Sequence, residues 1–76
     1  MADKQALEAF AGEFCAENGL HLALSWEMPA GYETAYGTYD IAENTLFLNW
    51  ALLESLPRGQ QFFYLFHELR HGMQYQ

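Results

Sequence analysis

The chain has 76 residues and a formal net charge of −7, because ten acidic side chains outnumber three basic ones. Phosphate backbones and anionic membrane surfaces are bound by clustered Lys and Arg, whereas Lys4, Arg58 and Arg70 are scattered along this chain. We therefore expect neither nucleic acid nor a membrane as a partner. Hydrophobic residues make up 51% of the chain, no apolar run is long enough to span a bilayer, and the N-terminus lacks the layout of a signal peptide. Together these features indicate one cytoplasmic domain over residues 1–76.

The first predicted element is a helix over residues 3–18. Its apolar side chains recur at the three-to-four spacing of one buried face, as Leu7, Phe10, Ala11, Phe14 and Cys15. Asp3 is in position to cap the start of this helix, and Asn18-Gly19 ends it, since glycine adopts the left-handed conformation that closes many helices. Cys15 is the only cysteine, and its place on the apolar face indicates a core residue rather than a reactive thiol.

Three strands are predicted next. Residues 20–26 alternate large apolar groups with smaller or polar ones, which places His21 on the solvent side of a half-buried strand. Residues 34–41 are rich in tyrosine and threonine and form the second strand, in which Gly37 marks a bulge. A short turn leads into the third strand, residues 45–49, which is expected to lie antiparallel to the second.

Two helices complete the predicted order. Asn49 is expected to cap a short helix that runs to Glu54, and Pro57 suits the first turn of a longer helix that continues through residues 60–74. The predicted fold is α+β: an N-terminal helix, a small antiparallel three-stranded sheet, a short helix and a long C-terminal helix. The helices are expected to cover one face of the sheet.

The last predicted helix contains the pattern H-E-x-x-H, from His67 to His71. Residues four apart on a helix project from the same face, so both imidazoles can bind one zinc ion at ~2.0–2.1 Å. Glu68 is offset by about 100° of helical rotation, which disfavours it as a ligand but places it near a zinc-bound water. Because zinc makes such water acidic, Glu68 is expected to act as the general base in hydrolysis. The competing interpretation is that these are two surface histidines in a coincidental pattern.

Residues 66–74 resemble the active-site helix of the zincin superfamily of metallopeptidases. The preceding order, a strand at residues 45–49 followed by a helical stretch and the motif helix, resembles the ImmA/IrrE-type and other minimal zincins. The resemblance implies a zinc-dependent hydrolase of peptide bonds, with His67 and His71 as metal ligands and Glu68 as the catalytic residue.

The third zinc ligand is the point at which this sequence departs from the zincin pattern. Zincins take that ligand from beyond the motif, whereas this chain runs only five residues past His71 and has Gln74 where metzincins have glycine. Three sources stay open. The chain is a fragment whose missing C-terminal helix supplies the ligand, or a second copy or partner does so, or Gln74, Asp40 or Glu43 completes the shell. Amide oxygens are weak zinc ligands, which disfavours Gln74.

Three hypotheses for function follow. The first is a metallopeptidase that binds an extended peptide or protein substrate along a sheet edge and hydrolyses it with a zinc-activated water. The second is a non-catalytic zincin-fold module for protein recognition or assembly, with structural metal or none. The third is a small α+β domain whose motif is coincidental. Tyr32, Tyr36 and Tyr39 are expected to pack rather than to contact substrate, and exposed aromatics make a homo-oligomer an open expectation.

Overall fold

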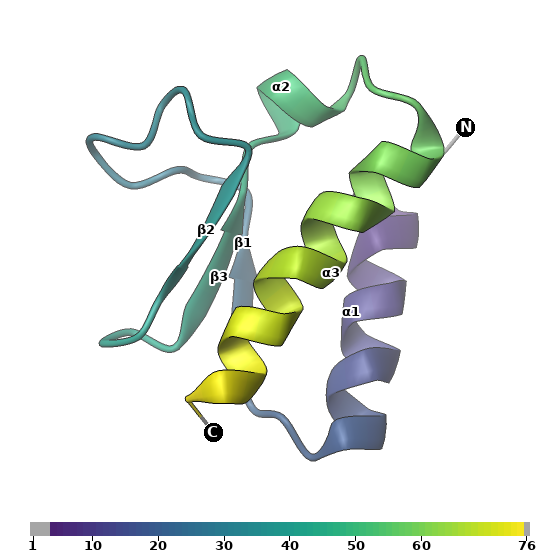
Figure 1. The fold of residues 1–76 in the computed structure, drawn as a ribbon, viewed down its shortest axis with the longest axis vertical. Helices are drawn as coiled ribbons and strands as arrows, with labels where there is room; N and C mark the ends of the chain where they lie inside the picture. Colours follow the sequence, from purple (N-terminus) through teal and green to yellow (C-terminus); the bar gives the residue numbers. More distant parts are fainter. Residues whose placement is uncertain (1–3, 76) are drawn as a thin grey trace.

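The computed structural model of the chain describes residues 4–75 (Figure 1), and its elements follow the predicted order. They are listed here in chain order: α1 (Lys4–Asn18), β1 (Ala23–Ser25), β2 (Gly37–Asp40), β3 (Thr45–Leu48), α2 (Trp50–Leu53) and α3 (Arg58–Gln74). The predicted α+β class is confirmed, although each strand is shorter than predicted. The expected cap at Asp3 lies outside the described residues, whereas Gly19 has the predicted positive φ, of 66°.

The sheet is mixed, with strand order β1-β3-β2. β2 and β3 pair antiparallel, as predicted, but β1 pairs with β3 in parallel, so the prediction of an all-antiparallel sheet was wrong. The reason is burial. β3 carries the consecutive buried residues Leu46, Phe47 and Leu48, and a strand that is buried on both faces favours the centre of a sheet, where both of its edges are paired. The hairpin therefore places β3, rather than β2, beside β1.

Asn44 joins all three strands from the turn between β2 and β3. Its φ of 51° lies in the left-handed region, which asparagine tolerates better than most residues. Its side chain accepts a hydrogen bond from the Tyr39 hydroxyl and donates one to the His21 carbonyl. Its own carbonyl accepts a hydrogen bond of 3.1 Å from the Ala23 N–H. This turn residue therefore fixes β1 beside β3.

α1 and α3 lie side by side on one face of the sheet (Figure 1). Their contact includes two edge-to-face aromatic pairs, Phe10–Phe62 at 5.4 Å and Phe14–Phe66 at 5.5 Å between ring centroids. The core under these helices consists of fully buried leucines and Ala11, namely Leu7, Ala11, Leu46, Leu48, Leu53, Leu65 and Leu69. Cys15 packs against this core as expected, and burial raises the pKa of its thiol.

The loop of residues 26–36 is tied to the end of β3 by Asn49. The Asn49 side-chain amide donates hydrogen bonds to the carbonyls of Glu33 and Ala35, at 2.9 and 3.0 Å. Asn49 does occupy the N-cap position of α2, but its side chain makes no capping hydrogen bond there. The Asn49 side chain therefore holds the loop and does not cap α2 as predicted. Within residues 4–75, no helix is both long and apolar enough to cross a bilayer.

Two glycines let α3 approach the sheet closely. A Cβ atom on Gly72 of α3 would lie 2.7 Å from Leu22 Cδ2, and one on Gly37 of β2 would lie 3.2 Å from Glu68 Cγ. Gly37 pairs in continuous register with Leu48, so the predicted bulge is absent from β2. The glycine is explained by this close approach instead. Pro57 is the N-cap of α3 rather than a residue of its first turn.

Candidate metal centre and catalytic residue

His67 and His71 lie one turn apart on the exposed side of α3, as their spacing predicts. Their Nε2 atoms are 3.2 Å apart, with ring centroids 4.7 Å apart and ring planes at 87°. The Phe63 ring stacks against the His67 ring, with centroids 6.3 Å apart. The two nitrogens therefore converge on one point in front of the helix.

This separation matches what a shared zinc ion requires. Two nitrogens bound to one tetrahedral zinc at ~2.0–2.1 Å lie roughly 3.3–3.4 Å apart, close to the 3.2 Å between Nε2 of His67 and Nε2 of His71. The same separation also fits an N–H···N hydrogen bond, in which the tautomers decide which imidazole donates and which accepts.

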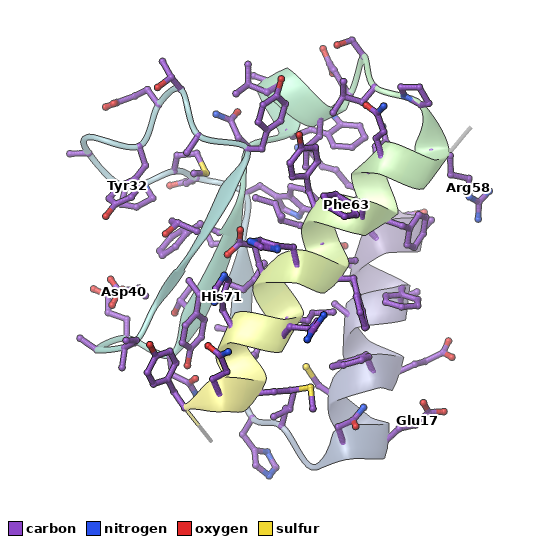
Figure 2. All side chains as sticks on the ribbon, in the orientation of Figure 1. Glu17, Tyr32, Asp40, Arg58, Phe63 and His71 are labelled. Atoms are coloured by element: carbon purple, nitrogen blue, oxygen red, sulfur yellow. The ribbon has the colours of Figure 1, made fainter. Side chains whose placement is uncertain are left out.

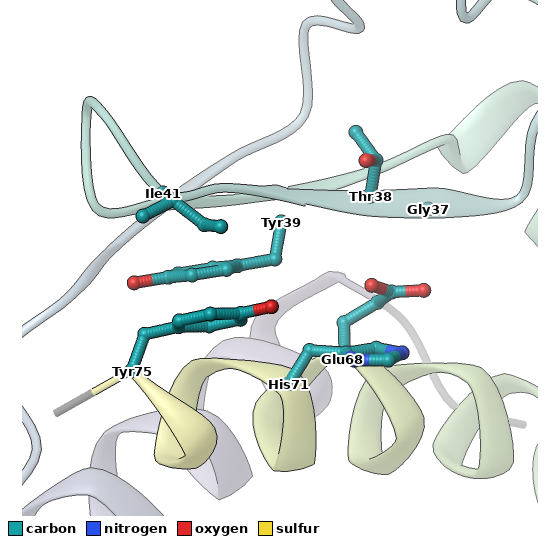
Figure 3. Close-up of a pocket in the computed structure, with 7 residues that line it drawn as sticks. All are labelled: Gly37, Thr38, Tyr39, Ile41, Glu68, His71 and Tyr75. Atoms are coloured by element: carbon teal, nitrogen blue, oxygen red, sulfur yellow. The ribbon is translucent and has the colours of Figure 1, made fainter.

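Glu68 lies on the inner side of α3, facing the sheet, and is only 8% exposed. Burial raises the pKa of its carboxyl group, and the adjacent His67 and His71 act in the opposite direction. Among residues 4–75, no hydrogen-bond donor satisfies the carboxylate oxygens, which point into the space beside Gly37 (Figure 3). A carboxylate held in this way has free lone pairs for a bound water or substrate.

A cavity of about 330 Å³ separates α3 from β2 and contains Glu68 and His71 (Figure 3). Tyr39 and Tyr75 close one end of it as a stacked pair, with ring centroids 6.2 Å apart and planes 13° apart. The Tyr75 hydroxyl points toward Glu68 and His71 (Figure 3). Tyr75 was missed by the sequence analysis, although it lies four residues after His71, which places it on the same helical face.

A second cavity, of about 260 Å³, lies on the other side of the histidine pair and is lined by His67, Arg70, His71 and Gln74. Gln74 therefore lies beside both candidate ligands. Arg70 is exposed and lines this cavity as well. Its positive charge is suited to balancing an anionic group near the histidines.

The upstream acids considered as third ligands lie elsewhere. Asp40 lies in a different cavity, apart from His67 and His71, and Glu43 is exposed, its N–H donating a hydrogen bond of 3.2 Å to Asp40 Oδ1. No group of three or more His, Cys, Asp or Glu side chains able to hold a metal ion exists within residues 4–75. His21 is exposed, as expected, and Tyr36 stacks on Tyr64 at 4.6 Å.

Comparisons with protein-family models, with curated proteins and with solved structures found no match to this chain.

Proposed function

We propose that the chain is a zincin-like metallopeptidase domain that binds one zinc ion through Nε2 of His67 and Nε2 of His71. The observation that carries this proposal is the 3.2 Å separation of those two nitrogens. It is supported by Glu68, whose carboxylate shares a cavity with His71. A zinc ion bound there would supply Lewis-acid activation of a water molecule and of the peptide carbonyl.

Glu68 is the general base in this proposal. Its carboxylate accepts a proton from the attacking water and then delivers it to the departing amine, so it ends the cycle ionised. The absence of competing hydrogen-bond donors from residues 4–75 supports this role, as does its burial at 8% exposure. Tyr75, whose hydroxyl points into the same cavity (Figure 3), donates a hydrogen bond to the carbonyl oxygen as negative charge develops there.

The substrate in this proposal is an extended peptide that adds to the free edge of β2. β2 lies at the end of the strand order, and its far side has no partner strand within residues 4–75. Main-chain hydrogen bonds along that edge would hold the peptide, as in other cases of strand addition. Because Gly37 of β2 lies against Glu68, a peptide paired there passes close to the general base. The remaining zinc ligand comes from Gln74 or from a group outside residues 4–75.

The test is hydrolysis of a mixed peptide pool by the zinc-loaded chain and by Glu68→Gln. We expect the variant to retain zinc and to lose roughly 10²- to 10⁴-fold in rate, the usual contribution of a general base. Glu13→Gln is the matched control, because Glu13 is an exposed acid on α1, and it should keep the full rate. A zinc-loaded parent chain that cleaves no peptide in the pool would reject the enzyme proposal.

The alternative is a non-catalytic module in which zinc is structural or absent. It is favoured by one observation, that residues 4–75 contain no group of three or more His, Cys, Asp or Glu side chains able to hold a metal ion. Structural zinc sites have four protein ligands and catalytic sites have three, so either role needs an added group. A loss of hydrolysis confined to Glu68→Gln would reject this alternative.

A further inference from the structure

Two cavities lie along the free edge of β2, and Thr38, Tyr39 and Ile41 line both of them. One is the 330 Å³ cavity toward α3 that contains Glu68 and His71. The other, of about 300 Å³, is lined by Pro29, Tyr32, Thr38, Tyr39, Asp40, Ile41 and Ala42. Tyr39 packs against the core under α3, so its neighbours Thr38 and Asp40 project to the opposite face of the sheet. Figure 3 shows Thr38 pointing away from α3, and Figure 2 shows Asp40 and Tyr32 on the side away from that helix.

A peptide paired along this edge would present its side chains to the two cavities in turn. Successive side chains of a strand point to opposite faces, and residues directly opposite on paired strands point to the same face. A peptide residue opposite Gly37 or Tyr39 therefore projects toward Glu68. The next residue, opposite Thr38 or Asp40, projects toward the cavity that contains Tyr32 and Asp40.

The lining of that second cavity favours a cationic side chain. Asp40 is half-buried, and its Oδ1 atom accepts a hydrogen bond from the Glu43 N–H at 3.2 Å, which orients the carboxylate. Tyr32 is 47% exposed and offers a ring to the same space. No Lys or Arg side chain lines this cavity. A carboxylate beside an aromatic ring binds guanidinium or ammonium groups through charge-assisted hydrogen bonds and cation–π contacts.

We propose that the β2 edge selects extended peptides with an Arg or Lys one residue from the side chain that enters the Glu68 cavity. This inference rests on the proposed function, for which it names the substrate class. The occupant is a basic peptide rather than a second copy of the chain. Two copies would each bring a net charge of −7, so repulsion between like charges opposes their pairing along this edge.

The test is peptide binding to the Glu68→Gln chain, so that no cleavage disturbs the measurement. Fluorescent peptides of identical sequence carry either Arg or citrulline, its neutral isostere, at each position in turn. We expect Arg to bind about five- to tenfold more tightly than citrulline at one position and little differently at the others. This is the effect of one half-exposed ion pair together with a cation–π contact.

Asp40→Asn, made in the same background, should abolish the preference for Arg. The asparagine keeps an oxygen that can accept the Glu43 N–H, so the turn should survive, and circular dichroism would verify the fold. Glu17→Gln is the matched control, because it makes the same change in net charge at an exposed position on α1, far from β2 (Figure 2). It should leave the preference intact.

Equal binding of the Arg and citrulline peptides, or an Arg preference that survives Asp40→Asn, would overturn this inference. So would a dimer whose formation competes with peptide binding. The Arg preference in binding tests this inference, whereas hydrolysis by the parent chain tests the proposed function, so the two results can be told apart. Hydrolysis without an Arg preference overturns the inference alone. An Arg preference without hydrolysis supports the inference and rejects the peptidase.

Discussion

Gly37 lies against both β3 and Glu68 of α3, and the space around it leaves little room for a side chain. A Cβ atom there would lie 3.0 Å from the Phe47 carbonyl oxygen, 3.1 Å from Leu48 Cδ2 and 3.2 Å from Glu68 Cγ. The first of these is a backbone atom of the central strand, which cannot give way as a side chain can. An added methyl group must therefore displace Glu68 or spread β2 from β3.

We expect Gly37→Ala to destabilise the chain by about 1–3 kcal/mol, as overpacked sites do. It should also lower the rate of peptide hydrolysis roughly ten- to hundredfold, because a small displacement of a reacting group has a large effect. Zinc content should be unchanged. Gly12→Ala is the control, since nothing lies within 4 Å of a Cβ atom there, and it should stabilise α1 by about 0.5–1 kcal/mol. Equal effects of the two substitutions, measured by urea unfolding, would contradict this account of Gly37.

Glu68 illustrates a conflict between stability and activity at a single residue. The residue is only 8% exposed, and its carboxylate opens onto the cavity between α3 and β2 without a hydrogen-bond donor from the described part of the chain. Burying a charge without such partners opposes folding. A residue placed for packing alone would not be an acid.

We therefore expect Glu68→Gln to make the metal-free chain more stable, by about 1 kcal/mol, while it abolishes hydrolysis. The neutral amide has nearly the same shape and avoids the cost of desolvating a charge. Thermal unfolding in the presence of a chelator would measure this. A variant less stable than the parent would show that the carboxylate serves the fold rather than the chemistry.

At the scale of elements, the turn at Asn44 sets the arrangement of the sheet. It joins β2 through the Tyr39 hydroxyl and the start of β1 through the His21 carbonyl, and its backbone holds a positive φ. Asn44 therefore stabilises the fold in two ways. Its backbone adopts the conformation with positive φ that the turn requires, and its side chain makes hydrogen bonds to two other segments.

We expect Asn44→Ala to destabilise the chain by about 2–4 kcal/mol, because it loses side-chain hydrogen bonds and strains the backbone. Asn44→Gly should cost about 1 kcal/mol less, since glycine accepts the positive φ. Chemical unfolding of both variants would measure the two contributions. If Ala and Gly are equivalent at this position, backbone strain has no part in fixing the turn.

The same turn explains which parts of the fold could be predicted from sequence. The spacing of Leu7, Phe10 and Phe14 depends only on the geometry of one helix, and the hairpin of β2 and β3 is local, so both were predicted correctly. The parallel pairing of β1 with β3 depends on hydrogen bonds between Asn44 and residues about twenty positions away. The buried run of Leu46, Phe47 and Leu48 favours a central position for β3, but it specifies neither the second partner strand nor its direction, and the prediction was wrong there.

The candidate site likewise contains residues that could be predicted from the sequence and residues that could not. His67, Glu68 and His71 could be assigned to neighbouring faces because helical geometry alone decides their relative positions. Gly37 and Tyr39 approach Glu68 and Tyr75 only because α3 packs across β2, and that contact depends on the tertiary fold. Tyr75 could have been predicted from the sequence, since it continues the four-residue spacing of His67 and His71.

Across the whole molecule, the helix layer and the sheet edge expose different kinds of side chain. The outer side of α1 and α3 exposes aromatic rings, including Phe10, Phe63 and Phe66. The sheet edge carries Asp40 and Glu43 instead. A domain of this size has a thin core, so a zinc ion bound by His67 and His71 should add materially to stability. Self-association through the aromatic side stays a prediction.

The zinc content of the purified chain decides whether His67 and His71 bind one zinc ion. Elemental analysis of protein prepared without added metal should give about one zinc per chain, and none for His67→Ala or His71→Ala, each of which leaves a single imidazole. His21→Ala is the matched control, because it removes an exposed histidine outside α3, and it should keep the metal. A parent chain without zinc, or zinc retained by both α3 variants, would contradict the assignment of this site.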